Sequence, residues 1–310
     1  MKLSHVARQI AQGLTGLSSR LAEIQRTVQE QKVLTAKLHL QHLKARGVLE
    51  NLQEAEFTVF SQFGDDGIIQ YLIANTEVTA ASFVEVGVED YKESNTRFLL
   101  INNNWKGLVI DSSTPAVKSI REDSIYWRHD LTAVAQFITA ENINATLREN
   151  GWAGELGLLS IDIDGNDYWI WKALEVVKPD IVVVEYNSLF GKTRAVTVPY
   201  DPEFRRTKAH HSNLYYGSSL KALDLLARDK GYGFVGSNSA GNNAYFVKLD
   251  RIGNLRTVAV EIGYVESRFR ESRNEEGKLT YLPAAERRQA IADLPVLNLE
   301  TNQLIKIRDL

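Results

Sequence analysis

The side chains that could do chemistry are acids and an amide that follow two apolar runs, residues 158–161 and 181–184. They are Asp162, Asp164, Asp167, Glu185 and Asn187. Carboxylate and amide oxygens are the ligands that hard divalent cations prefer, and a carboxylate can also act as a general base. The group therefore predicts a metal site, an acid–base site, or both.

Residues 158–161 and 181–184 have the composition of short strands that are buried on both faces. Residues 168–177 between them predict a helix that packs on the sheet and is stopped by Pro179. A strand–helix–strand unit makes its two strands parallel. Both acidic groups then reach the carboxyl edge of one sheet, where open α/β sheets bind ligands.

Further strands and helices are expected on both sides of this unit. The predicted strands are residues 83–86, 106–113 and 125–131, and the predicted helices carry residues 98–101, 140–148 and 217–228. Residues 231–235 and 243–247 predict an antiparallel pair that finishes the sheet. Together they indicate an α/β fold of the Rossmann-like type, with a mostly parallel sheet and an antiparallel terminal strand pair.

The loop after residues 83–86 argues against a dinucleotide. It contains one glycine, Gly87, and continues with Val88, Glu89 and Asp90. A dinucleotide fingerprint needs three glycines and a helix N-terminus that faces pyrophosphate, and an acidic loop repels phosphates. A cofactor without phosphates is expected. Asp111 lies 24 residues after Gly87, where an acid commonly binds ribose hydroxyls; the alternative is an aspartate that caps the next turn.

Residues 1–50 form a basic arm with eight Lys and Arg against three Asp and Glu. Its apolar positions step by three and four: Ile10, Leu14, Leu17, Leu21, Ile24 and Val28. A second series, Leu34, Leu38 and Leu43, is out of phase and predicts that the helix breaks or shifts near residue 32. The spacing favours an oligomerising coiled coil or helical hairpin; a helix packed on its own domain and a membrane-surface helix are the alternatives.

Two other segments could cover a ligand. Gln62 and Gly64 precede a helix that is expected to begin near residue 65, and this turn is either a helix cap or a lid over a cofactor. Residues 188–216 are a long polar connection that leaves the same sheet edge. It carries His210 and His211, which are a general base or simply exposed histidines.

Composition excludes several classes. There is no cysteine, so disulfides, thiolate catalysis and cysteine-bound metals are excluded. The chain beyond residue 50 is acidic, which argues against nucleic-acid binding. No apolar run reaches the ~18 residues of a membrane span, and the first 16 residues do not resemble a signal peptide, so a cytoplasmic protein is expected. Residues 251–310 predict a polar, mostly helical tail with a hairpin at 296–299 and 304–307.

The order and spacing of these features over residues 57–250 resemble a class I S-adenosylmethionine-dependent methyltransferase. Within that fold, Ser-Ile-Asp-Ile-Asp-Gly at 160–165 resembles the Lys-Ile-Asp-Val-Glu-Gly segment of FkbM-like methyltransferases. Ser-Gln-Phe-Gly-Asp-Asp-Gly at 61–67, with Phe60 before it, is similar to the segment before the first strand in that group.

The resemblance implies a site for S-adenosylmethionine. Glu85, Gly87, Asn95 and Thr96 would surround the methionine moiety. Asp111, followed by Ser112, would hold the ribose, and Asp130 with Leu131 would meet the adenine. The other cofactor-binding residues expected are Gln62, Gly64 and Asp162.

Related sugar O-methyltransferases bind magnesium through acids after the fourth and fifth strands and use a histidine base. The matching positions imply Asp164, Glu185 and Asn187 as Mg²⁺ ligands. Asp167 stands where that histidine would be, so the base is Asp167, His210 or His211.

The expected function is methyl transfer from S-adenosylmethionine to a hydroxyl of a sugar or nucleotide sugar, with help from a divalent metal. The partners are then a small-molecule or carbohydrate acceptor and further copies of the chain. The alternatives are a metal-independent N-methyltransferase, a Rossmann-type oxidoreductase and a coiled-coil adaptor with an inactive methyltransferase-like domain. The expected organisation is a helical arm (1–50), a methyltransferase domain (57–250) and a tail (251–310).

Overall fold

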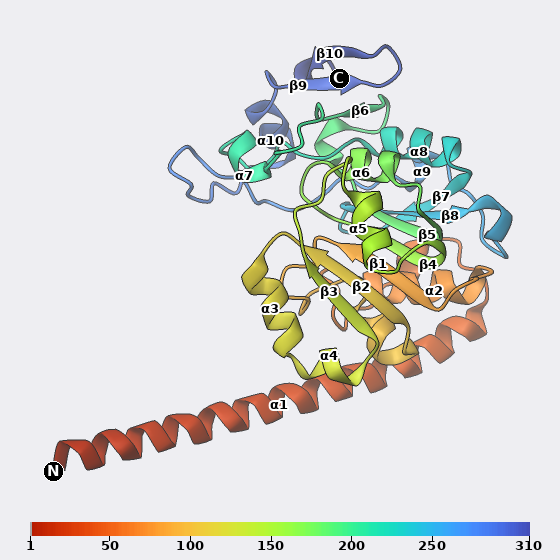
Figure 1. Ribbon diagram of the computed structural model, residues 1–310. Coiled ribbons are helices and arrows are strands. Elements are labelled where there is room, and N and C mark those ends of the chain that lie inside the picture. The colour runs from red at the N-terminus through yellow and green to blue at the C-terminus, as the bar shows by residue number, and fades with distance from the viewer. Residues whose placement is uncertain (1) are drawn as a thin grey trace. The chain divides into compact units, whose positions relative to one another are not determined.

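A computed structural model describes residues 2–310, without the side chains of residues 2–15, Ser18, Ala22 and Ala284 (Figure 1). The chain divides into two compact units, one ending at Arg46 and one from Gly47 to Leu310. Within the described residues, no helix has both the length and the hydropathy to cross a membrane.

The first unit is one helix, α1 (Lys2–Arg46), so the helix does not break near residue 32, and of the two predicted alternatives only a shift of the apolar face is left. Residues 30–36 contain no glycine or proline, and Thr35 Oγ1 donates to Gln31 O without interrupting the helix. The change in apolar phase therefore alters only the face that the apolar residues occupy. Leu17, Leu21, Ile24 and Val28 are exposed, whereas the side chains of Ile10 and Leu14 lie outside the described residues.

The second unit is built on a seven-stranded sheet in the order β3-β2-β1-β4-β5-β8-β7. The strands are β1 (Ser82–Val86), β2 (Lys106–Asp111), β3 (Leu131–Ala135), β4 (Gly154–Ile161), β5 (Val177–Glu185), β7 (Tyr232–Ser237) and β8 (Asn243–Lys248). β1 to β5 are parallel, and β8 is antiparallel to both β5 and β7. The Rossmann-like fold and its antiparallel terminal pair are thus confirmed, and the chain order reverses between β1 and β4, which is where such sheets bind ligands.

Helices α5 (Ile143–Glu149), α6 (Asp167–Ala173) and α8 (Leu220–Asp229) cover one face of this sheet. Val84, Leu159, Val182 and Phe246 point to that face and pack in one core with Trp171 of α6. Side chains alternate along a strand, so their neighbours point to the other face. On that face lie α2 (Asp65–Asn75) and a π-helical turn, η2 (Leu99–Asn103), which are joined by a hydrogen bond from Gln70 to Asn103.

The strand predicted at 125–131 is wrong. Residues Ser124–Arg128 form a short helix, α4, which follows α3 (Thr114–Glu122) and is capped by Asp123 Oδ1, the acceptor for Ile125 N. The strand begins only at Leu131. Similarly, α6 ends at Ala173, and Pro179, expected to stop the helix, lies within β5.

The long connection after β5 and the C-terminal tail pack together (Figure 1). The connection contains η3 (Ser188–Phe190), β6 (Val196–Thr197) and α7 (Arg206–Ala209). The tail contains α9 (Val260–Gly263), α10 (Ala284–Ala290), β9 (Pro295–Asn298) and β10 (Gln303–Lys306). β9 and β10 pair as the predicted hairpin, but the prediction that the tail is mostly helical is wrong, because α9 and α10 are both short. β6 pairs with β9 in a second sheet, so the tail is fastened to the connection that leaves the main sheet edge.

Candidate active site

The carboxyl ends of the five parallel strands open into a cavity of about 1160 Å³. Residues that follow each strand line it: Gly87 after β1, Asp111 at the end of β2, Gln136 after β3, Asp162 after β4 and Glu185 at the end of β5. The connection 188–216 and the tail supply the remaining wall. The sheet edge chosen from the sequence is therefore the edge that carries the cavity.

Gly87 allows the ends of β1 and β4 to meet. Its φ is 86°, and a Cβ at this position would lie 1.6 Å from the carbonyl oxygen of Asp162. Any other residue would be strained by the positive φ and would collide with that oxygen. The glycine serves the close approach of two strands, which in turn brings the loops after β1 and β4 to one cavity.

Asp162, Asp164 and Glu185 form an acidic cluster near the ends of β4 and β5, beside the point between β1 and β4 where the strand order reverses (the strand switch). One oxygen from each carboxylate can be chosen so that all three lie within 4.8 Å of one another. Asp164 sits at a positive φ of 57°, in the tight turn between β4 and α6. Glu185 is 8% exposed, and its Oε2 is buried without a hydrogen-bond partner among the described residues.

Burial and mutual repulsion disfavour the charged forms of this cluster. Burial raises the pKa of Asp162 well above its usual value, and the Asp164 carboxylate raises it further. The pKa of Glu185 is raised for the same reason, first by burial and then by Asp162 and Asp164. A buried carboxylate oxygen without a donor is costly, so the cluster is suited to receiving a cation.

Arg206 of α7 is the cation that the chain itself supplies. Its Nη1 donates to Asp164 Oδ1 at 2.5 Å, and its Nη2 lies 3.7 Å from Glu271 Oε2. The guanidinium also lies 4.2 Å from the centre of the Tyr216 ring. Burial lowers the pKa of this group, but Tyr216, Asp164 and Glu185 raise it, so the net pKa is above its usual value.

The end of β2 has the form expected of a ribose site. Asp111 Oδ2 accepts a hydrogen bond from Glu89 N, and its Oδ1 accepts one from Ser113 N. The carboxylate is thus held in place by backbone donors and keeps further acceptor capacity towards the cavity. Ser112 and Gln62, both predicted to bind the cofactor, also line the cavity.

Four other predicted cofactor residues do not line the cavity: Gly64, Glu85, Asn95 and Thr96. Glu85 is 3% exposed and accepts hydrogen bonds from Ser94 Oγ, Asn95 N and Thr96 N. Its carboxylate therefore fixes the segment after the first loop. Gly64 has a φ of 93° and is the residue that precedes α2 as its N-cap.

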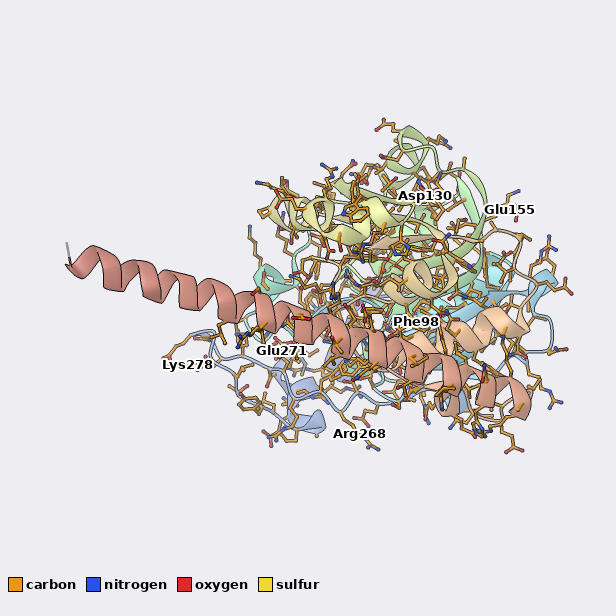
Figure 2. The ribbon with its side chains drawn as sticks, turned by 90° about the horizontal axis from the view of Figure 1, so that it is seen from below. Phe98, Asp130, Glu155, Arg268, Glu271 and Lys278 are labelled. Carbon is orange, nitrogen blue, oxygen red and sulfur yellow. The ribbon has the colours of Figure 1, made fainter. Side chains whose placement is uncertain are left out.

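Asp130 and Leu131 lie at the wrong edge of the sheet for an adenine contact. Asp130 O accepts from Gly107 N at the start of β2, so both residues belong to the amino edge. Figure 2 shows Asp130 far from Glu271, a residue that lines the cavity. This correction follows from the misplaced strand: the true carboxyl end of β3 leads to Gln136 and Phe137, and these residues line the cavity.

The predicted base residues also lie outside the cavity lining. Asp167 is fully buried, and its two oxygens accept from Ile163 N and Gly165 N, which shapes the acidic turn. Burial raises its pKa to about 6, against these donors. His210 Nδ1 is 2.7 Å from Ser212 Oγ, and His210 stacks on His211 with 4.1 Å between ring centres.

Asn187, a predicted metal ligand, does line the cavity, but its amide also organises the loop. Its oxygen accepts from Leu189 N, and its Nδ2 donates to the carbonyls of Leu214 and Tyr216. Asp162, predicted for the cofactor, stands instead beside Asp164 and Glu185.

Sequence reasoning missed the residues that the connection and the tail bring to the cavity. They include Arg206, Tyr216, Ser267, Glu271 and Arg287. Two of them are arginines in segments without regular apolar spacing, so no periodicity marked them. The paired Arg205 and Arg206 in a connection that leaves the acidic edge were the available signal.

Comparison with known proteins finds no related sequence and only low-scoring structural matches. No protein-family model matches the sequence, and no curated protein matches it significantly. Among solved structures, a methyltransferase from Clostridium acetobutylicum that depends on S-adenosylmethionine has 9% identity and a TM-score of 0.38, covering 59% of this chain and 89% of that one. An O-methyltransferase from Bacillus cereus in complex with SAH has 13% identity and a TM-score of 0.38, with coverages of 69% and 90%.

PKMT2 from Rickettsia typhi, in complex with AdoHcy, has 8% identity and a TM-score of 0.41, with coverages of 64% and 55%. Scores below 0.5 carry no argument about function, so the assignment of the fold rests on the strand order of the sheet.

Proposed function

We propose that this protein is a methyltransferase that uses S-adenosylmethionine to methylate a hydroxyl group of a small molecule, and that a divalent cation assists. The observation that carries the proposal is the acidic cluster, with the unpartnered Glu185 Oε2, at the same sheet edge as the Asp111 carboxylate. One cavity of about 1160 Å³ joins both features, and it is large enough for a donor and an acceptor together.

The lining fits the methyl donor. Asp111 is held by Glu89 N and Ser113 N in an orientation that leaves acceptor capacity for two ribose hydroxyls. Glu89, Asp90 and Glu93 also line this part of the cavity, and their negative charge favours a sulfonium cation over a phosphate. The donor's sulfur is then expected near Gly87 and Asp162.

The acidic cluster fits Mg²⁺, because Asp162, Asp164 and Glu185 offer hard oxygen ligands. A bound Mg²⁺ would lower the pKa of an acceptor hydroxyl and orient it. During transfer the S–CH₃ bond breaks, the O–CH₃ bond forms and the hydroxyl proton leaves. A carboxylate oxygen of the cluster that the cation does not engage can accept that proton, while the remaining walls position the two reactants and exclude water.

A second candidate is transfer without a metal, and Arg206 favours it. Its guanidinium already neutralises part of the cluster by bonding to Asp164. An acceptor could then be held by Arg206 and the carboxylates alone. An amine acceptor would fit this case, since it attacks without needing strong activation by a cation.

Binding of Mn²⁺, followed by electron paramagnetic resonance, separates the two candidates. Metal assistance predicts one site per chain that is lost in Asp164→Asn and kept in Asp201→Asn, which changes an exposed aspartate of the connection 188–216. Equal Mn²⁺ binding by both variants, or no binding by the wild type, would exclude metal assistance at this cluster and favour transfer without a metal.

The exposed apolar residues of α1 support a homo-oligomer. Leu17, Leu21, Ile24 and Val28 follow the spacing of a coiled-coil seam and are 46–66% exposed. A second copy of the same helix would cover them, and we propose that the arm holds copies of the enzyme together.

A further inference from the structure

Arg287 of α10 is a buried cation that has no ion pair among the described residues; burial lowers its pKa, and Glu266, which attracts it only from a longer distance, raises that pKa in part. The residue is 4% exposed and lines the cavity. Its Nη2 donates to Ser267 O at 2.6 Å, whereas its Nε is buried without a hydrogen-bond partner. Among the described residues no carboxylate lies within ion-pair distance of Arg287. A guanidinium stays charged at all accessible pH values, so this arrangement is costly unless a ligand completes it.

The other two arginines of the cavity are satisfied by the protein. Arg206 bonds to Asp164 and lies near Glu271. Arg270 is exposed and donates through Nε and Nη2 to Tyr281 O. Arg287 therefore differs from both: it is the most buried of the three and has the fewest partners.

The position of Arg287 is fixed relative to the acidic cluster. Ser267, whose carbonyl holds the guanidinium, donates its own N–H to Ser188 Oγ at 3.0 Å. Ser188 lies three residues after Glu185, which is the last residue of β5. Arg287 therefore lines the wall beside the acidic cluster, on the β5 side of the strand switch. Asp111, the expected ribose ligand, lies on the other side, beyond β1.

We infer that Arg287 binds an anionic group, a carboxylate or a phosphate, of the methyl acceptor. The inference rests on the proposed function, because the wall beside β5 is where the acceptor would lie. Arginine is suited to such groups, since its planar fork can donate two parallel hydrogen bonds to one anion. The acceptor is then an acidic molecule, such as a sugar acid or a sugar phosphate, whose hydroxyl is placed at the acidic cluster.

The first test uses inorganic phosphate, titrated by calorimetry into the full-length wild type, Arg287→Met and Arg288→Met. Arg288 is the neighbouring arginine on the same helix and does not line the cavity. We expect saturable phosphate binding that weakens about 10- to 100-fold in Arg287→Met and is unchanged in Arg288→Met. No saturable binding by the wild type, or equal binding by all three, would overturn the inference, and binding lost equally in both variants would show an adventitious surface site only.

Glucose 6-phosphate, glucuronate and glucose then distinguish the source of the anion. We expect one of the two acids, but not glucose, to bind more tightly than inorganic phosphate in a manner that depends on Arg287. Arg287→Lys keeps the charge without the fork and should bind with intermediate affinity. Thermal melting of each variant establishes that it is folded.

The competing role for Arg287 is binding the carboxylate of the methyl donor. S-adenosylhomocysteine carries that carboxylate and 5′-methylthioadenosine does not. If Arg287→Met weakens the first and leaves the second unchanged, the arginine serves the donor and the inference is wrong. If the wild type binds neither nucleoside but still binds phosphate through Arg287, the proposed function fails while the anion site stands.

Discussion

Replacing Glu185 by glutamine should stabilise the protein and abolish its response to divalent metal. Glu185 is buried, has an unpartnered oxygen and lies within 4.8 Å of two other carboxylates. At an effective dielectric constant of about 20, two charges at that separation repel by roughly 3 kcal/mol. The attraction of Arg206 offsets part of this, so Glu185→Gln should raise the free energy of unfolding by about 1–3 kcal/mol near pH 8.

The extra stability of Glu185→Gln over the wild type should increase with pH. Burial and the neighbouring acids raise the pKa of Glu185 in the folded state, so the folded wild type holds this proton more tightly than the unfolded chain does. The wild type therefore loses stability as pH rises above the usual glutamate value of 4.5, and the loss is complete above the folded-state pKa. The glutamine variant avoids that loss, so its advantage should grow from pH 5 to pH 8.

The assay is thermal melting with and without Mg²⁺. A ligand at 100 times its dissociation constant adds about 2.7 kcal/mol, which should raise the melting temperature of the wild type by roughly 5–10 °C. Glu185→Gln should melt higher than the wild type without metal and show no rise with it. Glu271→Gln is the matched control, since Glu271 lines the same cavity but is exposed and lies outside the cluster. A variant less stable than the wild type that still responds to Mg²⁺ would refute the reasoning.

Three further predictions test the fold and the arm. Gly87→Ala should lower the free energy of unfolding, measured in urea, by at least about 3 kcal/mol, because the new Cβ would collide with the carbonyl oxygen of Asp162. Gly154→Ala, which has a similar φ of 84° but open space around it, should lower it by about 1 kcal/mol, and equal losses would contradict the close approach of β1 and β4. Burial raises the pKa of Asp66 to about 6, so the free energy of unfolding of the wild type should fall by up to about 3 kcal/mol between pH 4 and 6, whereas that of Asp66→Asn should not. Denaturant titrations at each pH measure this, and the same pH dependence in both proteins would refute it. Deleting residues 1–46 should reduce the number of chains per particle in light scattering, and an unchanged number would exclude a coiled coil.

The sheet could be predicted because its strands are short, apolar and buried on both faces. Leu158 to Ile161 and Ile181 to Val184 are uninterrupted apolar or small residues, and such runs place the following acids at the carboxyl edge. The error at residues 125–131 has a local cause. Ile125 and Tyr126 favour a strand by composition, but Asp123 caps a short helix there by accepting a hydrogen bond from Ile125 N.

The acidic cluster could be predicted in part, but the cavity wall formed by the connection 188–216 and the tail could not. The spacing of the strands predicted that Asp164 and Glu185 lie close together. It did not show that both Asp167 oxygens accept hydrogen bonds from the backbone of the turn. Arg206 and Arg287 lie in the connection and the tail, two segments that pair through β6 and β9 although these strands are about 100 positions apart. No local pattern encodes such a contact, so these arginines are visible only in the folded chain.

The most direct test of the central claim is a calorimetric titration of S-adenosylhomocysteine, and separately of NADH, into the wild type and Asp111→Ala. We predict that S-adenosylhomocysteine binds one site per chain, that Asp111→Ala weakens this binding about 10- to 100-fold while the variant still melts cooperatively as a folded protein, and that NADH does not bind. Binding of NADH alone would contradict the account and indicate an oxidoreductase, and binding of neither by the wild type would indicate that this sheet edge does not hold a nucleoside donor.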